Sequence, residues 1–449
     1  MSHLSLTDAD REEMLAAIGV SSLDELFADI PPGVRFERAL DLEPALSEPE
    51  LVAHLEELAS RNAHTGGELS FLGAGVYDHY VPAVVDAVLQ RGEFLTAYTP
   101  YQPEMSQGVL QTIFEYQTAI CELTGMDVSN ASGYDGTTVA ADACFIAKHA
   151  TGRSKVVLAE SVNPQVRQVV KTYAPGFGLD VVEVPHDGGT TDPDRFAASC
   201  SDAACAIFQQ PNFFGCLEPA PGLASAASDA GALAVAHVDP VSLGVLEAPG
   251  RYGCAIAIGE GQGAGNFQSF GGPHYGFIAA RSDYTRRMPG RIVGETTDAA
   301  GRRGYVLTLQ TREQHIRREK ATSNITTNQT LLALAGLVHL TWLGPQGLRD
   351  VGETCMTLAE HAKERLLAAG AELLFPGKAT FKEFAVRIGR NGREVVRAAR
   401  ERGVHPGYAL GRDYERMDDA LLVAVTEKRT PADIDRLARV LGEVASWPS

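Results

Sequence analysis

The chain has 449 residues, 45% hydrophobic and 21% charged, and this size and composition predict a globular protein of two or three domains. A formal net charge of −18 argues against nucleic acid and anionic membranes as partners, because both select for basic surfaces. No cationic and apolar leader opens the chain, and the longest apolar stretch, residues 331–343, is too short to cross a bilayer. We therefore expect a soluble protein of the cytoplasm.

The chain begins with an N-terminal helical segment, residues 1–70, and continues into a predicted large domain, residues 71–327. In the large domain short apolar runs alternate with helical patterns. Runs that are apolar throughout and separated by helices are typical of a mostly parallel sheet covered by helices, so the expected fold class is α/β. The predicted strands are 155–159, 180–184, 204–208, 233–238, 254–258 and 275–280, and the predicted helices are 8–18, 48–61, 107–123, 137–150, 164–173 and 221–230.

The last part of the chain, residues 328–449, reads as a small C-terminal α+β domain. Thr430 and Pro431 fit the N-cap and first position of its final helix. Its predicted helices are 329–343, 348–368, 393–402 and 431–444, and its predicted strands are 381–388 and 420–426. In open α/β sheets ligands sit at the carboxyl ends of the strands, so functional residues of the large domain are expected there.

A first candidate is the loop 132–138, which leads directly into a predicted helix. Small and hydroxylated residues before a helix offer free N–H groups and a favourable dipole, which a phosphate group can use. In this interpretation Gly136 and Thr137 would face the phosphate. The alternative is an ordinary N-cap, and the negative charge of Asp135 favours it.

A second candidate is the pair His237 and Asp239 at the end of the predicted strand 233–238. An Asp at this position could pair with a pyridinium nitrogen and keep it protonated, and a His could stack on the ring of a cofactor. Both side chains point to the same face of the strand, so they could instead hydrogen-bond to each other or cap a turn.

The distribution of lysines bears on this site. An α/β sheet with an Asp at this position is typical of enzymes that bind pyridoxal phosphate through a lysine amine, placed after the next strand. That window offers Asn266, Gln268 and Ser269, and the chain has no lysine between Lys171 and Lys320. Neither of these two lysines is a convincing substitute. The sequence therefore predicts a subunit that cannot hold the cofactor covalently.

Other chemistries receive little support. The glycine-rich run 259–265 formally matches a dinucleotide-binding turn, but glycines continue to position 272 and exclude the helix that such a turn requires. There is no HExxH or GxSxG motif. The seven cysteines include no CxxC pair. Cys121, Cys144 and Cys254 lie in apolar segments and are expected to be reduced core residues. The spacing of Cys200 and Cys205 is unlike that of a zinc site, and we predict no metal site.

Several long strings resemble the glycine cleavage system P-protein family, glycine dehydrogenase (decarboxylating), and in particular subunit 1, the α subunit of its split form. The resemblance covers nearly the whole chain and the strings occur in order, which makes it more specific than any single motif. The strings are FLGAGVYDHY at 71–80, AYTPYQPE at 97–104, residues 107–108 and 130–142, SFGGP at 269–273 and RREKATSNI at 317–325.

The resemblance implies the fold of PLP-dependent transferases (fold type I, aspartate aminotransferase-like) and a heteromeric enzyme. In this family glycine is decarboxylated on pyridoxal phosphate, CO2 is released, and the aminomethyl group passes to the lipoyl arm of H-protein. In the split form the homologous β subunit carries the cofactor lysine, and two αβ pairs form an α2β2 assembly that works with the T- and L-proteins. This chain alone would be inactive, and Asp135, Gly136, Thr137, His237 and Asp239 would be a vestigial cofactor pocket without a catalytic role.

The resemblance also suggests why an α subunit is kept, because enzymes of this fold build each active site at a dimer interface. Tyr98, Thr99, Tyr101 and Gln102 are expected to reach towards the active site of the β subunit, on a segment stiffened by Pro100. The alternative is that both tyrosines only pack the interface. Two other classes of function stay open: an independent PLP enzyme that uses Lys320, and a non-catalytic assembly subunit.

Overall fold

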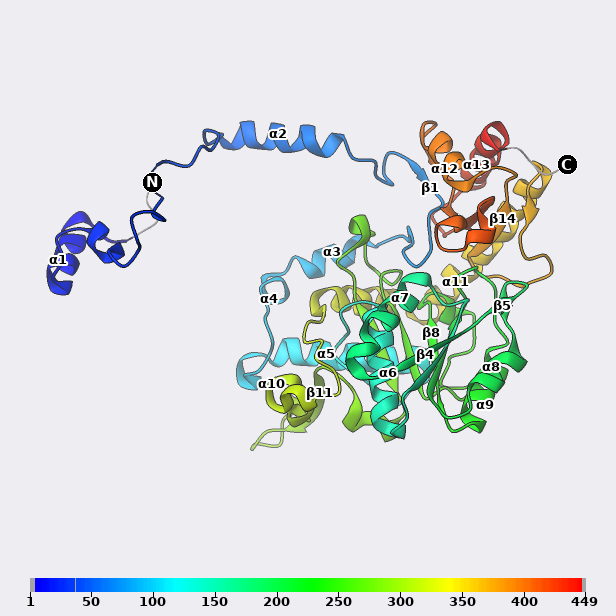
Figure 1. The fold of residues 1–449 in the computed structure, drawn as a ribbon, viewed down its shortest axis with the longest axis horizontal. Helices are drawn as coiled ribbons and strands as arrows, with labels where there is room; N and C mark the ends of the chain where they lie inside the picture. The colour runs from blue at the N-terminus through cyan, green and yellow to red at the C-terminus, as the bar shows by residue number, and fades with distance from the viewer. Residues whose placement is uncertain (1–4, 37, 446–449) are drawn as a thin grey trace. The chain divides into compact units, whose positions relative to one another are not determined.

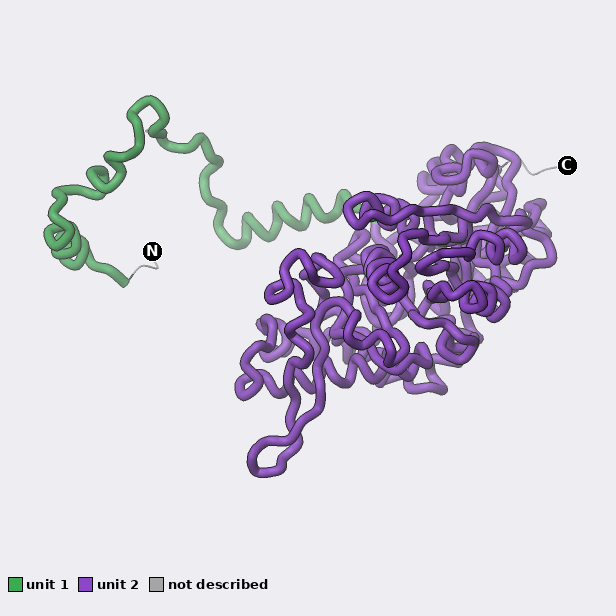
Figure 2. Tube along the Cα trace, turned by 60° about the horizontal axis from the view of Figure 1, so that its bottom comes forward, with its two compact units in different colours: residues 1–63 green, residues 64–449 purple. Residues whose placement is uncertain are grey.

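The N-terminal part of the chain forms a unit of its own. The computed structural model describes residues 5–36 and 38–445, and its contacts divide the chain into unit 1, residues 1–63, and unit 2, residues 64–449 (Figure 2). Unit 1 contains α1 (Asp8–Ile18), the 3-10 helix η1 (Leu23–Phe27) and α2 (Glu48–Ser60), which confirms both predicted helices. Capping boxes begin α1 and α2, at Thr7 and Ser47.

No described residue of unit 1 is buried. On α2, the large apolar side chains Leu51, Val52, Leu55 and Leu58 are 40–53% exposed. The segment is also acidic, with fourteen Asp and Glu against four Arg and no Lys. The described residues of unit 1 therefore form helices but no hydrophobic core.

Unit 2 is built around a seven-stranded sheet, which we call the central sheet. Its strand order is β2-β10-β9-β8-β7-β3-β4, parallel from β9 to β4, while β10 runs antiparallel to both β9 and β2. The predicted α/β class with a mostly parallel sheet is confirmed. The strands are β2 (Val128–Ser129), β3 (Lys155–Ala159), β4 (Asp180–Val184), β7 (Ala203–Gln210), β8 (Leu233–Val238), β9 (Ile256–Glu260) and β10 (Gly276–Ala280).

Helices cover this sheet because its strands are apolar along their whole length. In Figure 1, α6 and α7 lie on one side of β4 and β8, and α8 and α9 lie on the other. Nine consecutive residues of α6, 139–147, are buried, since this helix packs across β7, β9 and β10. The helices of this part are α3 (Ala83–Leu89), α4 (Gly92–Leu95), α5 (Gln107–Thr124), α6 (Thr138–Thr151), α7 (Pro164–Tyr173), α8 (Pro193–Ser199) and α9 (Ala220–Asp229).

A second, smaller sheet lies in the C-terminal part of unit 2. Its strand order is β13-β14-β17-β16, antiparallel throughout, and its apolar face packs with α11, α12 and α13 into a separate hydrophobic cluster. The elements are α11 (Thr330–Ala368), β13 (Glu372–Leu373), β14 (Glu383–Arg387), α12 (Gly392–Arg400), β16 (Tyr408–Ala409), β17 (Ala420–Ala424) and α13 (Pro431–Val444).

Helix α11 joins the two parts of unit 2. It combines the two helices predicted at 329–343 and 348–368. The backbone between them kinks at Gly344, which has a left-handed φ of 62° and is followed by Pro345. By length and composition one window of this helix is apolar enough to cross a membrane, a test that the core helix of a globular protein also passes. Its buried residues, such as Leu334 and Leu366, belong to the two hydrophobic clusters of unit 2.

Candidate functional site

Asp239 follows β8 at the carboxyl end of the central sheet, where the sequence predicts a contact with a cofactor ring. Its Oδ2 atom lies 2.5 Å from Nζ of Lys382, and its Oδ1 atom accepts a hydrogen bond from the backbone N–H of Val241. The side chains of Asp239 and Lys382 are 12% and 2% exposed, so the ion pair is buried. A cation of the chain itself thus occupies the position expected for a ring nitrogen.

Lys382 precedes β14 of the smaller sheet and reaches across to the central sheet. Besides the Asp239 carboxylate, its ammonium group contacts Nε2 of His79 at 2.8 Å and lies 3.5 Å from the ring centroid of Tyr77. A cation over an aromatic face is stabilised by the ring quadrupole, more so where water is excluded. The ammonium group therefore has partners on several sides.

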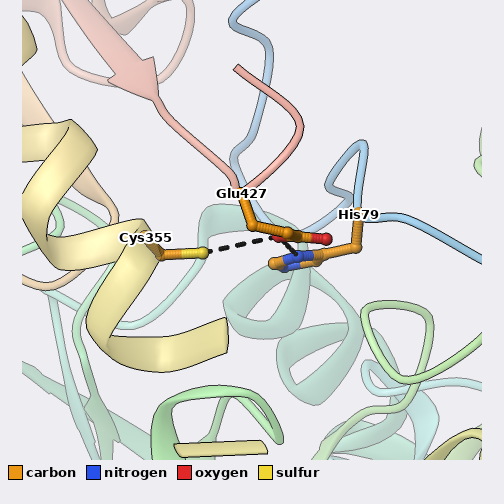
Figure 3. Close-up of side chains that lie close together, drawn as sticks. All are labelled: His79, Cys355 and Glu427. Carbon is orange, nitrogen blue, oxygen red and sulfur yellow. Dashed lines mark hydrogen bonds and ion pairs between the residues drawn. The ribbon is translucent and has the colours of Figure 1, made fainter. Parts of the chain in front are cut away.

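His79 continues this network towards Cys355 and Glu427, and the three side chains converge from separate segments (Figure 3). Nδ1 of His79 lies 2.7 Å from Oε2 of Glu427, and the thiol of Cys355 donates to the same oxygen at 3.5 Å. Burial alone would raise the pKa of Glu427, but His79 and the N–H of Tyr80 lower it to about 2. Burial raises the pKa of Cys355, so this residue is a thiol.

These three residues have the composition of a metal site, but their atoms are already used. Both ring nitrogens of His79 have protein partners, since Nε2 faces the Lys382 ammonium group and Nδ1 faces Glu427. A metal ion bound to His79 would therefore break one of these contacts and place a second cation near Lys382. We read the group as a hydrogen-bond network.

The string at 71–80, which carries the family resemblance, connects this network to the smaller sheet. Glu383, next to Lys382, accepts hydrogen bonds from the N–H of Ala74 at 2.7 Å and from the hydroxyl of Tyr77 at 2.8 Å. Burial raises the pKa of Glu383 to about 7, against these hydrogen bonds and the charge of Lys382, which lower it. The string thus positions both an aromatic ring and a histidine around Lys382.

The loop 132–138 caps α6 with carboxyl groups of the protein. Oδ1 of Asp135 accepts from the backbone N–H groups of Thr137 and Thr138, at 3.0 and 2.7 Å. The N–H of Gly136 donates to Oε2 of Glu260, at 2.9 Å. Burial raises the pKa of Glu260 to about 8, although its backbone hydrogen bonds lower it. The donors suggested for a phosphate are therefore occupied.

His237 lies on β8, two residues before Asp239. Its side chain is buried, and neither of its ring nitrogens has a hydrogen-bond partner within residues 5–36 and 38–445. Burial lowers the pKa of His237 to about 4, against the opposite effect of the Asp239 charge, so the ring is neutral near pH 7. His237 and Asp239 do not bond to each other, because Asp239 turns to Lys382.

The predicted interface segment, 98–102, is largely open to solvent. Tyr98 is 89% exposed and Tyr101 46%. A cavity of about 260 Å³ is lined by Tyr98, Thr99 and Arg291, and a second one of about 190 Å³ is lined by Tyr101 and Arg291. The guanidinium group of Arg291 lies over the Tyr101 ring, 5.7 Å from its centroid, and the side chain of Gln102 donates to Glu104. The segment thus offers aromatic and polar groups to a partner.

The structure also locates the other lysines and the window after β9. Lys171 forms an ion pair with Glu183 and is 48% exposed, and Lys320 lies exposed in a 3-10 helix. In the window, Asn266 is buried, with its amide bonded to backbone carbonyls. Gln268 and Ser269 belong to a turn whose Ser269 has a left-handed φ of 44°. The exposed position of Lys320 gives no support to an independent enzyme that uses this lysine.

Several residues of the network were missed in the sequence because they come from distant segments. Lys382 and Glu383 lie in a predicted strand of the C-terminal domain, far from the window after the next strand where a cofactor lysine is expected. Glu260 falls at the edge of the glycine-rich run, which the sequence indicates only as a loop. A charged residue inside an apolar strand pattern, as in Phe381-Lys382-Glu383-Phe384, is the one available signal, because lone charges are rarely buried without a partner.

Comparisons with known proteins agree with this architecture. The family described as "Glycine cleavage system P-protein" matches residues 1–441. A probable glycine dehydrogenase (decarboxylating) subunit 1 from Geobacillus kaustophilus is 51% identical over 442 residues, 98% of each chain.

Among solved structures, a glycine decarboxylase (P-protein) of the glycine cleavage system in inhibitor-bound form is similar with a TM-score of 0.91 and 43% identity. The match covers 99% of this chain and 100% of that one. A sphingosine-1-phosphate lyase from Burkholderia pseudomallei, 16% identical, matches with a TM-score of 0.67 over 92% of this chain and 93% of its own. This more distant likeness shows the fold alone, that of PLP-dependent transferases of fold type I.

Proposed function

Because this chain belongs to the glycine cleavage system P-protein family, we propose that it is the α subunit of a split enzyme whose β subunit carries the cofactor lysine. The pair decarboxylates glycine, releases CO2 and passes the aminomethyl group to the lipoyl arm of H-protein. Pyridoxal phosphate, which this family uses, supplies an electron sink for the decarboxylation. We place the assembly, α2β2, in the cytoplasm, together with the T- and L-proteins of the same system.

The observation that carries this proposal is the position of the lysine amines. Lys382 is the lysine that contacts Asp239. Its amine forms an ion pair with the carboxylate that is expected to face the ring nitrogen of the cofactor. The aldehyde carbon of pyridoxal lies on the opposite side of the ring, so this amine is at the wrong end to bind it covalently. The residues of this pocket therefore do not fit the cofactor, which supports a cofactor lysine supplied by the partner.

The contribution of this chain would be the wall formed by Tyr98, Thr99, Tyr101 and Gln102. Two properties support this assignment: the high exposure of Tyr98, and the two cavities that share Arg291. Pro100 is buried beneath the segment and limits its backbone freedom. A stiff segment with exposed polar and aromatic groups can orient a substrate in the partner's site and exclude water from it.

Tyr101→Phe and Tyr98→Phe are each expected to lower kcat/KM for glycine about 5-fold in the assembled enzyme. The reason is the loss of one hydroxyl hydrogen bond, worth about 1 kcal/mol, at the substrate. The measurement is CO2 release from glycine with and without H-protein. Tyr408→Phe is the matched control, because it removes a hydroxyl bonded to Asp413 in the smaller sheet. If both interface variants keep the wild-type rate and dependence on H-protein, the wall only packs an interface.

The assembled enzyme is expected to contain one pyridoxal phosphate per αβ pair. The measurement is the absorbance spectrum of this chain with the cofactor, alone and after mixing with the β subunit, followed by borohydride reduction and mass mapping. We expect an absorbance band and glycine decarboxylation only in the mixture, with the label on a β-subunit lysine. A label on Lys320 of the isolated chain would instead identify an independent PLP enzyme.

A further inference from the structure

The cofactor pocket of this chain is filled by the chain's own charged groups at both ends. At one end the Lys382 ammonium group lies on Asp239, and at the other end carboxyl groups occupy the N–H donors before α6. The two ends correspond to the ring nitrogen and the phosphate of the cofactor. The first position therefore holds a cation of the protein, and the second holds the carboxyl groups of Asp135 and Glu260.

At the ring end the charges are balanced without a ligand. The Asp239 carboxylate faces one ammonium group at 2.5 Å, and His79 accepts from the same ammonium group while its other nitrogen contacts Glu427. A pyridinium nitrogen that approached Asp239 would meet Lys382, and two cations in a buried site repel each other strongly. The ring of Tyr77 also lies against the ammonium group, with its centroid 3.5 Å from Nζ, and adds a further contact that holds Lys382 in place.

At the phosphate end the donors have protein acceptors. Asp135 takes the N–H groups of Thr137 and Thr138 as well as the Thr137 hydroxyl, and Glu260 takes the N–H groups of Gly136 and Gln262. A Cβ atom at Gly136 would lie 2.7 Å from the backbone nitrogen of Glu260, so the loop and β9 are closely packed. A phosphate dianion would have to displace two acidic groups and remain beside them.

We propose that Lys382 stands in for the cofactor's ring nitrogen as the permanent counter-ion of Asp239, which makes this pocket a closed half-site that excludes pyridoxal phosphate. The inference deepens the proposed function and rests on it, because the partner then holds the one cofactor of each pair. It also assigns Lys382 a structural role, since this residue joins the smaller sheet to the carboxyl end of the central sheet.

The stability test uses a double-mutant cycle on the full chain. Lys382→Met and Asp239→Asn are each expected to lower the melting temperature by about 5–10 °C, because each leaves one buried charge without its partner. The double variant removes both charges and is expected to recover at least half of that loss. Lys363→Met is the matched control: Lys363 is also buried, but pairs with Glu360 and Thr380, so adding Asp239→Asn to it should give additive losses.

A ligand test probes the same position. Lys382→Ala leaves a space beside Asp239 in which ethylammonium chloride can restore the cation. We expect this salt to raise the melting temperature of Lys382→Ala by at least about 2 °C over equal sodium chloride. The wild-type chain and the Lys382→Ala/Asp239→Asn variant should show no such rise. Additive losses in the cycle, or equal rises in all three proteins, would overturn the inference.

The cofactor itself provides the decisive measurement, which needs no variant. The wild-type chain alone, incubated with pyridoxal phosphate, is expected to show no specific absorbance band and no rise in melting temperature. Borohydride labelling of Lys382, or cofactor retained without a covalent bond, would overturn the inference. If this inference fails, an active complex should contain two cofactors per αβ pair. If the proposed function fails, the complex should not decarboxylate glycine at all.

Discussion

Replacing Asp78 by alanine is expected to lower the free energy of unfolding by about 3–5 kcal/mol, since it leaves a buried charge unpaired. Asp78 accepts from Nζ of Lys428 at 2.6 Å and from Nη2 of Arg429 at 2.7 Å. The side chains of Asp78 and Arg429 are only 10% and 7% exposed. Without the carboxylate the Arg429 guanidinium group stays in a site with little water.

The measurement is urea unfolding of the variant beside a surface control, Asp435→Ala. Asp435 pairs with Arg365 at 2.6 Å, but both side chains are about half exposed, and such pairs contribute less than about 1 kcal/mol. A loss for Asp78→Ala as small as that for Asp435→Ala would show that Arg429 finds water or another acceptor. The comparison therefore separates buried pairing from charge alone.

Glu260→Gln is expected to change the pH dependence of stability. Burial raises the pKa of Glu260 from its ordinary 4.5 to about 8, so the folded chain binds a proton that the unfolded chain releases above pH 4.5. Its contribution to stability is complete below pH 4.5 and is lost as the pH rises through 8. Between pH 5 and pH 9 the wild type should lose about 3–4 kcal/mol relative to the variant.

The variant keeps one hydrogen-bond acceptor where the carboxyl group has two, for the N–H groups of Gly136 and Gln262. It should therefore start about 1 kcal/mol below the wild type at pH 5 and become the more stable protein near pH 9. Denaturant unfolding at pH 5, 7 and 9 measures both effects. Asp142 and Glu383 each have a pKa raised to about 7 by burial, so they make the free energy of unfolding fall with pH by the same amount in both proteins. Parallel curves would mean that Glu260 is ionised in the folded chain.

The sequence predicts the central sheet well because its strands are apolar throughout. The strands at 155–159, 180–184 and 233–238 are found at the predicted residues. The strand predicted at 254–258 begins two residues later, at Ile256. The hairpin of β11 (Ile292–Thr297) and β12 (Arg303–Thr308) was missed, because only the first two residues of β11 are buried and the apolar signal is short.

The candidate site could be predicted only in part, for a different reason. A pattern within β8 identifies Asp239 as a residue at the end of a strand, but its partner comes from another sheet. No local pattern relates the two segments, and the packing of α11 and the string at 71–80 brings them together. A residue whose role depends on its own strand or helix can be predicted from the sequence. An ion pair between two sheets can be identified only once the fold is known.

The exposed helices of unit 1 have a consequence for how this chain behaves before it is assembled. Helices of 11 and 13 residues without any buried side chain are marginal in water and open easily to proteases. Their exposed leucines also favour aggregation of chains that remain unassembled. Unassembled copies of this chain are therefore expected to be cut first within unit 1 or to aggregate through it.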